Sequence, residues 1–193
     1  MTTLTQKDLE NFWIRCYLSP STDLENAAID RAYLDFNRTL HGIGKEQSDD
    51  KLNDLKSVMK KIVLELLTMT FKNQDDFDRW HETKCAELVK AFQDISNHPL
   101  YIGQAQKWIN MTLKYLFALG ENRIKGISRN YEYFHFPIDN IIQEKLVKRG
   151  IPKIDIPWSR INNYGKYLKY QCLVREKFAG QIPIEVEFRL FNE

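Results

Sequence analysis

Apolar residues recur at helical spacing through the first half of the chain. The clearest series advances in steps of three and four residues and consists of Leu52, Leu55, Met59, Ile62 and Leu66. Such steps place the side chains on one face of an α-helix, which is stable when that face is buried against other elements. The series therefore predicts an amphipathic helix.

Capping residues predict where the two preceding helices begin. Thr5 has a side chain suited to cap a first helix that runs to about Leu18. The pair Thr22 and Glu25 has the spacing of a capping box, in which a hydroxyl and a carboxylate each bind a free backbone N–H group. A second helix is therefore expected from this pair to about Leu40.

A further helix with a mixed apolar face is predicted after Asn73, another suitable capping residue. Its apolar stripe consists of Phe77, His81, Cys85, Leu88, Phe92 and Ile95. His81 and Cys85 are four residues apart, a spacing at which two side chains can share a metal ion. Because both lie in the apolar stripe and no second pair of ligands accompanies them, we interpret them as buried. We expect no metal and no cofactor.

Residues 102–119 are apolar on nearly every side, apart from a narrow polar strip of Gln104, Lys107 and Lys114. A helix of this kind usually lies in the middle of a fold. Three more helices are expected, over 139–148, 163–178 and from Pro183 onward, separated by a loop over 121–137 and an extended segment over 151–162. We therefore expect a mainly α protein, with residues 1–193 forming one compact multi-helical domain around the central apolar helix.

Charge is distributed unevenly along the chain. Residues 1–100 contain 13 Lys and Arg against 17 Asp and Glu, whereas residues 101–180 contain 14 against 6, so the net charge of +2 conceals a basic second half. Residues 101–180 also hold 13 of the 24 aromatic residues. We therefore expect an acidic helical layer over 1–98 and a basic, aromatic-rich layer over 99–193.

Basic residues that alternate with aromatic ones suit nucleic-acid binding, because Lys and Arg neutralise phosphates while rings stack on bases. Two stretches have this composition, the loop over 121–133 and the segment over 158–170. The residues expected to contact phosphate are Arg123, Lys125, Arg129, Arg160, Lys166 and Lys169. The residues expected to stack on bases are Tyr133, Trp158 and Tyr170. The same charges also suit pairing with the acidic half of this chain or with a second copy.

Two segments resemble parts of DNA-binding proteins. Residues 40–45, Leu-His-Gly-Ile-Gly-Lys, are similar to the turn of a helix-hairpin-helix, in which backbone N–H groups contact a DNA phosphate. The alternative is a glycine pair that ends a helix.

The second resemblance covers residues 103–142 and is to helix-hairpin-helix DNA glycosylases. It lies in Gly103, Ala105 and Lys107 on the apolar helix, followed by Phe136-Pro137-Ile138-Asp139 before the next helix, without the Gly-rich hairpin directly ahead of the lysine. The resemblance implies that Asp139 stabilises a cationic sugar as a base departs and that Lys107 acts as a nucleophile. The alternative for Asp139 is a helix cap.

One histidine is a separate candidate for acid or base chemistry. His135 stands between Phe134 and Phe136 near the basic loop, where a small change of environment moves its protonation toward neutral pH. No P-loop, dinucleotide-binding glycine motif or nucleophile elbow accompanies it. The sequence therefore leaves open whether the protein is an enzyme.

The cysteines and the apolar stretches indicate the compartment. Cys16, Cys85 and Cys172 are far apart and form no CxxC motif, which is typical of free thiols in a reducing compartment. The chain starts without an apolar leader, and its most apolar stretch, residues 62–71, is too short to cross a bilayer. We expect a soluble cytoplasmic protein that does not associate with membranes.

Three functions agree with these patterns. The first is nucleic-acid binding through the basic second half. The second is a protein-interaction or self-assembly module without catalysis. The third is a DNA-processing enzyme similar to the helix-hairpin-helix glycosylases.

Overall fold

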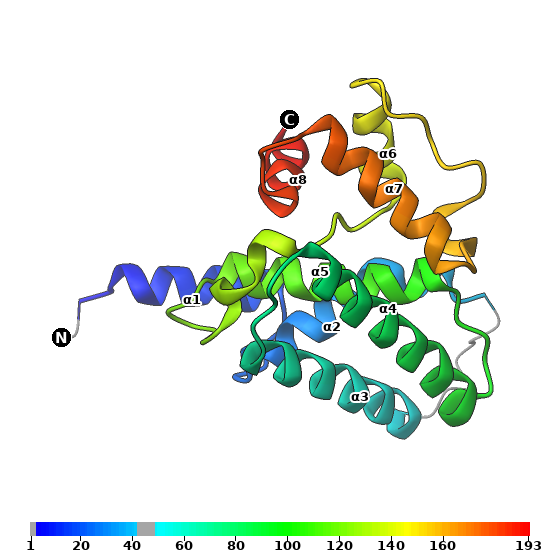
Figure 1. Ribbon diagram of the computed structural model, residues 1–193. Coiled ribbons are helices and arrows are strands. Elements are labelled where there is room, and N and C mark those ends of the chain that lie inside the picture. Colours follow the sequence, from blue (N-terminus) through cyan, green and yellow to red (C-terminus); the bar gives the residue numbers. More distant parts are fainter. Residues whose placement is uncertain (1–2, 42–48) are drawn as a thin grey trace.

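The computed structural model describes residues 3–41 and 49–193, and every regular element in these ranges is helical (Figure 1). The α-helices are α1 (Gln6–Tyr17), α2 (Leu24–Phe36), α3 (Asp49–Thr68), α4 (Gln74–Ala91), α5 (Ile102–Leu119), α6 (Asn140–Val147), α7 (Tyr164–Lys177) and α8 (Pro183–Asn192). Short 3₁₀ turns are η1 (Asn37–Thr39), η3 (Ile127–Arg129), η4 (Tyr131–Tyr133) and η5 (Trp158–Arg160), and η2 (Phe92–Ser96) is a π-helical turn. The expected mainly α fold is confirmed.

The cap predicted for the first helix is present. Thr5 Oγ1 accepts the backbone N–H of Asp8 at 3.2 Å, and Asp8 Oδ2 accepts the backbone N–H of Thr5 at 2.9 Å, so α1 begins with a reciprocal capping box. The segment that resembles a helix-hairpin-helix turn spans residues 40–45, and its residues 42–45 lie outside the described residues.

The capping box predicted at Thr22 and Glu25 is wrong. The N-cap of α2 is Asp23, whose Oδ1 accepts the backbone N–H of Asn26 at 2.9 Å. A carboxylate at this position binds the helix N-terminus with a full negative charge. Lys60 Nζ of α3 also holds the carboxylate at 2.7 Å, and the sequence pattern gave no sign of this tertiary contact.

The two helices that follow agree with their predictions. Along α3, Leu55, Met59, Ile62 and Leu66 are buried and Leu52 is half-buried. Asn73 caps α4 by accepting the backbone N–H of Asp76 at 2.9 Å. The apolar pattern of both helices therefore points into the same core.

The central helix is α5, as expected from its composition. All its residues except Ile102, Phe117 and Ala118 are buried. Its most extensive contacts are with α2 and α4, and Trp108 Nε1 donates a hydrogen bond to Ile29 O of α2 at 3.1 Å. Gly120, at φ 79°, follows its last turn. The polar groups that α5 carries are thus held in the interior and need partners there.

The C-terminal helices α6, α7 and α8 lie together on the side of α5 away from α2 and α3 (Figure 1). Pro183 at the first turn of α8 confirms that the tail is helical. Segment 158–161 closes over the start of α5, where the backbone N–H of Gly103 donates to Ile161 O at 2.9 Å. A Cβ atom on Gly103 would lie 1.7 Å from Trp158 O, so only glycine permits this approach.

Some of the basic side chains of the second half pair with the acidic first half. Arg123 contacts Glu10 of α1 at 2.6 Å, and Arg175 contacts Asp78 of α4 at 2.9 Å. Part of the charge asymmetry in the sequence is therefore used within the fold. Within the described residues, no helix is both long and apolar enough to cross a membrane.

Candidate functional site

A buried lysine of α5 meets the half-buried aspartate that precedes α6. Lys107 Nζ lies 2.6 Å from Asp139 Oδ2, and the Lys107 side chain is only 4% exposed. Asp139 is also the N-cap of α6, because its Oδ1 accepts the backbone N–H of Ile142 at 2.8 Å. The helix-cap interpretation of Asp139 is therefore confirmed, and the second oxygen of its carboxylate faces the lysine.

A second ion pair, with both partners buried, lies on the same side of α5. Lys114 is two helical turns after Lys107, so both side chains project from one face. Lys114 Nζ lies 2.7 Å from Glu187 Oε1 of α8, and 4.3 Å above the ring of Phe191. Both charged side chains are almost fully buried. Neighbouring buried pairs of this kind are uncommon and indicate a polar centre within the fold.

The environment of Glu187 shifts its proton equilibrium. Burial raises the pKa of Glu187, and the charge of Asp139 adds to this effect, while Lys114 and Lys107 oppose it. Glu187 Oε2 is buried and has no hydrogen-bond partner among the described residues. A perturbed carboxyl group with an unused oxygen beside a second carboxylate is typical of functional sites.

Three adjoining cavities run along this face of α5, and we call them the α5 trough. The first, of about 40 Å³, is lined by both ion pairs and by Lys145 and Phe191. The second, of about 250 Å³, shares Lys114 and Phe191 with the first and adds Tyr17 and Tyr115. The third, of about 240 Å³, continues past Tyr17 to Trp13 of α1. The trough thus leads from exposed aromatic side chains to the Lys107–Asp139 pair.

The predicted phosphate-contacting residues of the first basic stretch are dispersed. Arg123 is paired with Glu10, and Arg129 Nη1 donates to Leu67 O at 3.2 Å. Lys125 is exposed and Tyr133 is half-buried. This stretch follows the C-terminal end of α5.

The second basic stretch begins at the opposite end of α5, a helix of 18 residues that is about 27 Å long. Arg160 lies over the ring of Tyr101, Lys166 pairs with Asp155 at 3.3 Å, and Lys169 is exposed. The two stretches therefore do not form one ridge.

Two of the three rings expected to stack on bases belong to the core. Trp158 is 7% exposed and Tyr170 is 4% exposed. Burial places both rings out of reach of a nucleic acid on the surface. Trp158 lies in the segment that closes over the start of α5, and Tyr170 lies on the buried side of α7. The burial of these two rings was not predicted from the sequence, because an aromatic residue next to lysines has the same pattern in a core and on a binding surface.

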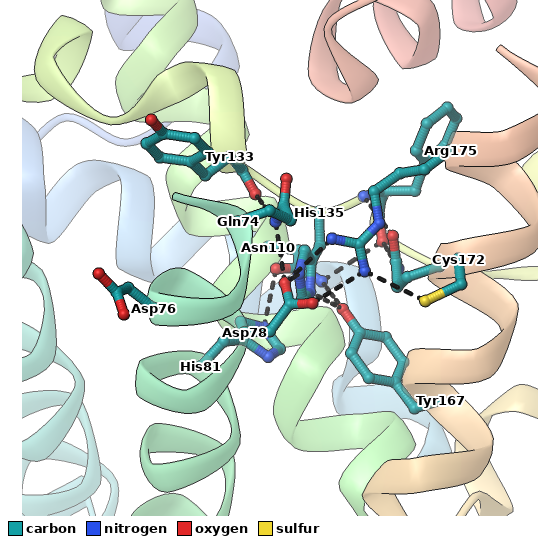
Figure 2. Close-up of polar contacts among 12 residues, drawn as sticks. Gln74, Asp76, Asp78, His81, Asn110, Tyr133, His135, Tyr167, Cys172 and Arg175 are labelled. Atoms are coloured by element: carbon teal, nitrogen blue, oxygen red, sulfur yellow. Dashed lines mark hydrogen bonds and ion pairs between the residues drawn. The ribbon is translucent and has the colours of Figure 1, made fainter. Parts of the chain in front are cut away.

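His135 lies in a different place, at the centre of a buried polar network (Figure 2). Its Nε2 lies 2.7 Å from Asp78 Oδ1, and its Nδ1 lies 2.8 Å from the hydroxyl of Tyr167. Arg175 contacts the same Asp78 carboxylate through both terminal nitrogens, at 3.1 and 2.9 Å. Tyr167 also accepts from Asn110 Nδ2 at 2.9 Å. The network ties α4, α5, α7 and the loop before α6 together.

The same network includes His81. His81 Nε2 lies 3.0 Å from Asn110 Oδ1, and Nδ1 lies 2.9 Å from the hydroxyl of Tyr164. Burial lowers the pKa of both His81 and His135, so the two rings are neutral at pH 7. Every ring nitrogen has a partner, which agrees with the interpretation of His81 as a buried, satisfied histidine. Within the described residues no group of three or more His, Cys, Asp and Glu side chains is arranged to hold a metal ion.

Lys114 and Glu187 form a buried ion pair that was not predicted from the sequence. The signal for Lys114 was present, since lysine on a helix that is apolar on nearly every side must be paired in the interior. Glu187 gave no such signal, because Ile184 to Leu190 alternates in a way that fits a strand as well as a helix.

Comparisons with protein families, with curated proteins and with solved structures found no match for this chain.

Proposed function

We propose that this protein is an enzyme of nucleic-acid processing that breaks the N-glycosidic bond between a base and its sugar. The observation that carries the proposal is the contact of Lys107 Nζ with Asp139 Oδ2 at 2.6 Å. These two residues are 32 positions apart, and they are the two for which the glycosylase resemblance implies chemistry. They lie at the inner end of the α5 trough, where a substrate can approach from the aromatic side.

The pair suits the proposed reaction for a physical reason. Departure of a base leaves positive charge on the sugar, and a fixed carboxylate beside the anomeric carbon stabilises that charge. The hydrogen bond from Ile142 holds Asp139 in place through the other oxygen. The carboxylate is thus positioned before the charge develops, which is what makes electrostatic stabilisation effective.

A covalent route is available through Lys107. Its ammonium passes a proton to Asp139, the free amine forms a bond to C1′, and the glycosidic C1′–N bond breaks. The base leaves with the bonding electron pair and takes the proton from Asp139. The amine bound at C1′ then passes one of its protons to the ring oxygen as the C1′–O4′ bond breaks, which leaves an iminium between Lys107 and C1′. Water adds to this iminium, and departure of the Lys107 amine releases the sugar as an aldehyde.

The departure from the glycosylase pattern concerns the contact with the nucleic-acid backbone. The Gly103 amide at the start of α5 is used by Ile161 O, and the N–H groups of Gln104 and Ala105 are used by Tyr101 O. Phosphate recognition therefore falls to exposed cations such as Lys125 and Lys169. Binding through such cations weakens steeply with salt.

The test of Asp139 uses Asp139→Asn. Asparagine caps a helix about as well as aspartate, so the variant is expected to fold while losing the negative charge. The probes are duplex and single-stranded oligonucleotides, each carrying one uracil, hypoxanthine, 8-oxoguanine or 3-methyladenine, and base loss is detected as strand breakage after hot alkali. We expect the wild type to release at least one of these bases and Asp139→Asn to release it at least about 100-fold more slowly.

The matched control is Asp23→Asn. Asp23 is also an N-cap that is paired with a lysine, Lys60, but it lies at the start of α2 away from the α5 trough. It should leave base release unchanged. Equal losses in both variants would contradict a catalytic role for Asp139, and no release by the wild type from the panel would contradict the proposed reaction.

The covalent route has its own test. Borohydride reduces an imine to a stable amine, so it traps a wild-type enzyme–DNA adduct that survives denaturing electrophoresis. Lys107→Gln should form no adduct, while Lys90→Gln, which changes an exposed lysine of α4, should form as much as the wild type. If the wild type releases a base but no adduct is trapped, the covalent route is contradicted. Water would then attack the sugar, and Lys107 would serve only as the ion-pair partner of Asp139.

A second candidate function is protein interaction or self-assembly, favoured by α1. None of the residues of this helix is buried, and Leu9, Phe12 and Trp13 are 44%, 56% and 69% exposed. Neighbouring exposed apolar side chains often mark an interface. If they form one, the molecular mass from light scattering will rise with protein concentration, and Phe12→Ser with Trp13→Ser will hold it at one chain.

We also propose a reducing compartment such as the cytoplasm. Cys16, Cys85 and Cys172 are unpaired, and Cys85 is buried. Protein isolated from its host with a thiol-blocking reagent should carry the label on Cys16 and Cys172, the two exposed thiols.

A further inference from the structure

The Lys114–Glu187 pair has hydrogen-bonding capacity that the fold does not use. Glu187 Oε1 accepts from Lys114 Nζ at 2.7 Å, whereas Oε2 is buried without a partner among the described residues. Keeping a carboxylate oxygen in the interior without a donor is costly. Since Glu187 lines the small cavity beside Lys107 and Asp139, a donor supplied by a ligand is the natural partner for this oxygen.

Lys114 supplies the complementary group. An ammonium carries three N–H donors, and the Lys114 ammonium donates one of them to Glu187 Oε1. The rings of Phe191 and Phe188 lie 4.3 and 5.1 Å from Nζ, and ring faces attract the cation without using a directed hydrogen bond. The pair therefore offers a ligand one donor and one acceptor side by side.

The adjoining cavity has room and lining for a flat ring. Its volume is about 250 Å³, and its walls include Tyr17, Phe188 and Phe191. Aromatic walls hold a heterocycle by stacking, with little dependence on which heterocycle it is. Selection between heterocycles is then left to the polar groups where this cavity adjoins the smaller one. Lys114 lines both cavities, and Glu187 lines the smaller one.

We propose that Glu187 and Lys114 read the pairing edge of a nucleobase, and this rests on the proposed function. Glu187 Oε2 accepts an N–H of the base, and Lys114 Nζ donates to the adjacent oxygen or nitrogen. The ring lies in the larger cavity, and the sugar carbon points toward Asp139. Glu187 and Lys114 act as specificity-determining residues, whereas Asp139 and Lys107 perform the chemistry.

The test uses free bases, so that it does not depend on catalysis. The probes are uracil, hypoxanthine and adenine, each compared with a partner in which methylation removes the N–H: 3-methyluracil, 1-methylhypoxanthine and N6,N6-dimethyladenine. Binding to the full chain is followed by ligand-observed NMR. We expect at least one parent base to bind about tenfold or more tightly than its methylated partner, which corresponds to one buried hydrogen bond.

Glu187→Gln replaces one carboxylate oxygen by an amide that donates, so it should abolish the difference between parent and methylated base. Glu185→Gln is the matched control, because Glu185 lies on the same helix but pairs with Arg189 on the surface. It should keep the wild-type preference. If Glu187→Gln does not fold, the double variant Lys114→Met with Glu187→Met tests the same point, because apolar residues of similar size replace a buried ion pair with little loss of stability.

The outcomes separate the two proposals. Asp139→Asn should bind the parent bases as the wild type does while releasing them from DNA at least about 100-fold more slowly. A preference that depends on Glu187, in a protein that releases no base, would support the reading of the base and overturn the proposed reaction. Equal binding of parent and methylated bases, or no binding of any probe to the wild type at its solubility limit, would overturn the role of Glu187.

Discussion

His135 Nε2 lies 2.7 Å from Asp78 Oδ1, and this contact joins the loop before α6 to α4. Both residues are buried, and Arg175 completes the pairing of the Asp78 carboxylate from α7. Elements from both halves of the sequence thus depend on one carboxylate. The α5 trough is lined separately by α1, α5, α6 and α8, so the network of Asp78 supports the fold and lies outside the proposed reaction.

Asp78→Asn should strongly destabilise the protein. The substitution leaves Arg175 without its ion pair and weakens the hydrogen bond from His135, and breaking a buried pair by removing one partner costs about 3–5 kcal/mol. Asp94→Asn, which changes an exposed carboxylate on η2, should cost less than about 0.5 kcal/mol. Urea unfolding monitored by circular dichroism measures both values. Similar midpoints for the two variants would contradict this role of Asp78.

Stability should fall as the pH drops below neutral because of the buried histidines. Burial lowers the pKa of His81 and His135 in the folded state, so the unfolded chain binds more protons at acidic pH. The stabilising contribution is complete above the unfolded pKa of about 6.5 and is lost as the pH falls from there toward the folded pKa. The loss is at most about 1.4 kcal/mol per pH unit for each histidine.

The measurement is urea unfolding at several pH values between 7.5 and 5.5. His135→Gln should show a shallower decrease than the wild type, whereas His41→Gln, which changes an exposed residue, should show the same decrease. Comparing variants removes the contribution of other groups such as Glu187, whose raised pKa acts in the opposite direction. If the free energy of unfolding of His135→Gln falls with pH as steeply as that of the wild type, His135 does not contribute to the pH dependence.

Asp78 adds a second loss of stability at lower pH. Burial alone raises the pKa of Asp78, but the hydrogen bonds from His135 and Arg175 outweigh it, and the pKa lies well below its ordinary value. Its contribution is therefore present above the unfolded pKa of about 3.9 and disappears as the pH falls through the folded pKa. The free energies of unfolding of Asp78→Asn and of the wild type should thus become more similar below about pH 4. A difference in the free energy of unfolding between the two proteins that stays constant down to pH 2 would contradict this role of Asp78.

The Lys114–Glu187 pair should show strong coupling in a double-mutant cycle. Glu187→Met alone leaves a buried lysine without its carboxylate and should cost about 3–5 kcal/mol, whereas the double variant with Lys114→Met should unfold within about 1–2 kcal/mol of the wild type. Urea unfolding of the four proteins measures the coupling. Additive losses would show that the two side chains do not act as a pair.

Gly103→Ala should destabilise the start of α5. The added methyl group would lie 1.7 Å from Trp158 O, so segment 158–161 must move, at a cost of about 1–3 kcal/mol or more. Gly165→Ala in the first turn of α7 meets only the Asn163 side chain, at 3.1 Å, and should change stability by less than about 1 kcal/mol. Thermal unfolding of both variants measures the difference. Equal melting temperatures would contradict the close approach at Gly103.

Tryptophan fluorescence should report the open end of the α5 trough. Trp13 is 69% exposed, whereas Trp80, Trp108 and Trp158 are at most 7% exposed. Acrylamide should therefore quench one fraction of the emission readily, and Trp13→Phe should remove that fraction. A second readily quenched fraction that persists in Trp13→Phe would show that another tryptophan is accessible.

The sequence alone determined the helices. Periodic apolar positions and capping residues such as Thr5 and Asn73 act within a few residues of the chain, so the pattern carried the information needed for α1, α3, α4 and α5. It also determined that α5 is central, because a helix that is apolar on nearly every side has to be surrounded. The misplaced start of α2 shows the limit of this reasoning, since Lys60 from another helix holds Asp23 there.

Only the tertiary structure decided which polar residues meet. The sequence singled out Lys107 and Asp139 through a resemblance, but their contact depends on how the loop over 121–137 returns to α5. It gave no indication of Glu187, and it placed Trp158 and Tyr170 on a surface when they belong to the core. The physical reason is that a charge or ring has the same local pattern whether it faces water or a partner, and its partner is chosen by helix packing over long separations in the chain.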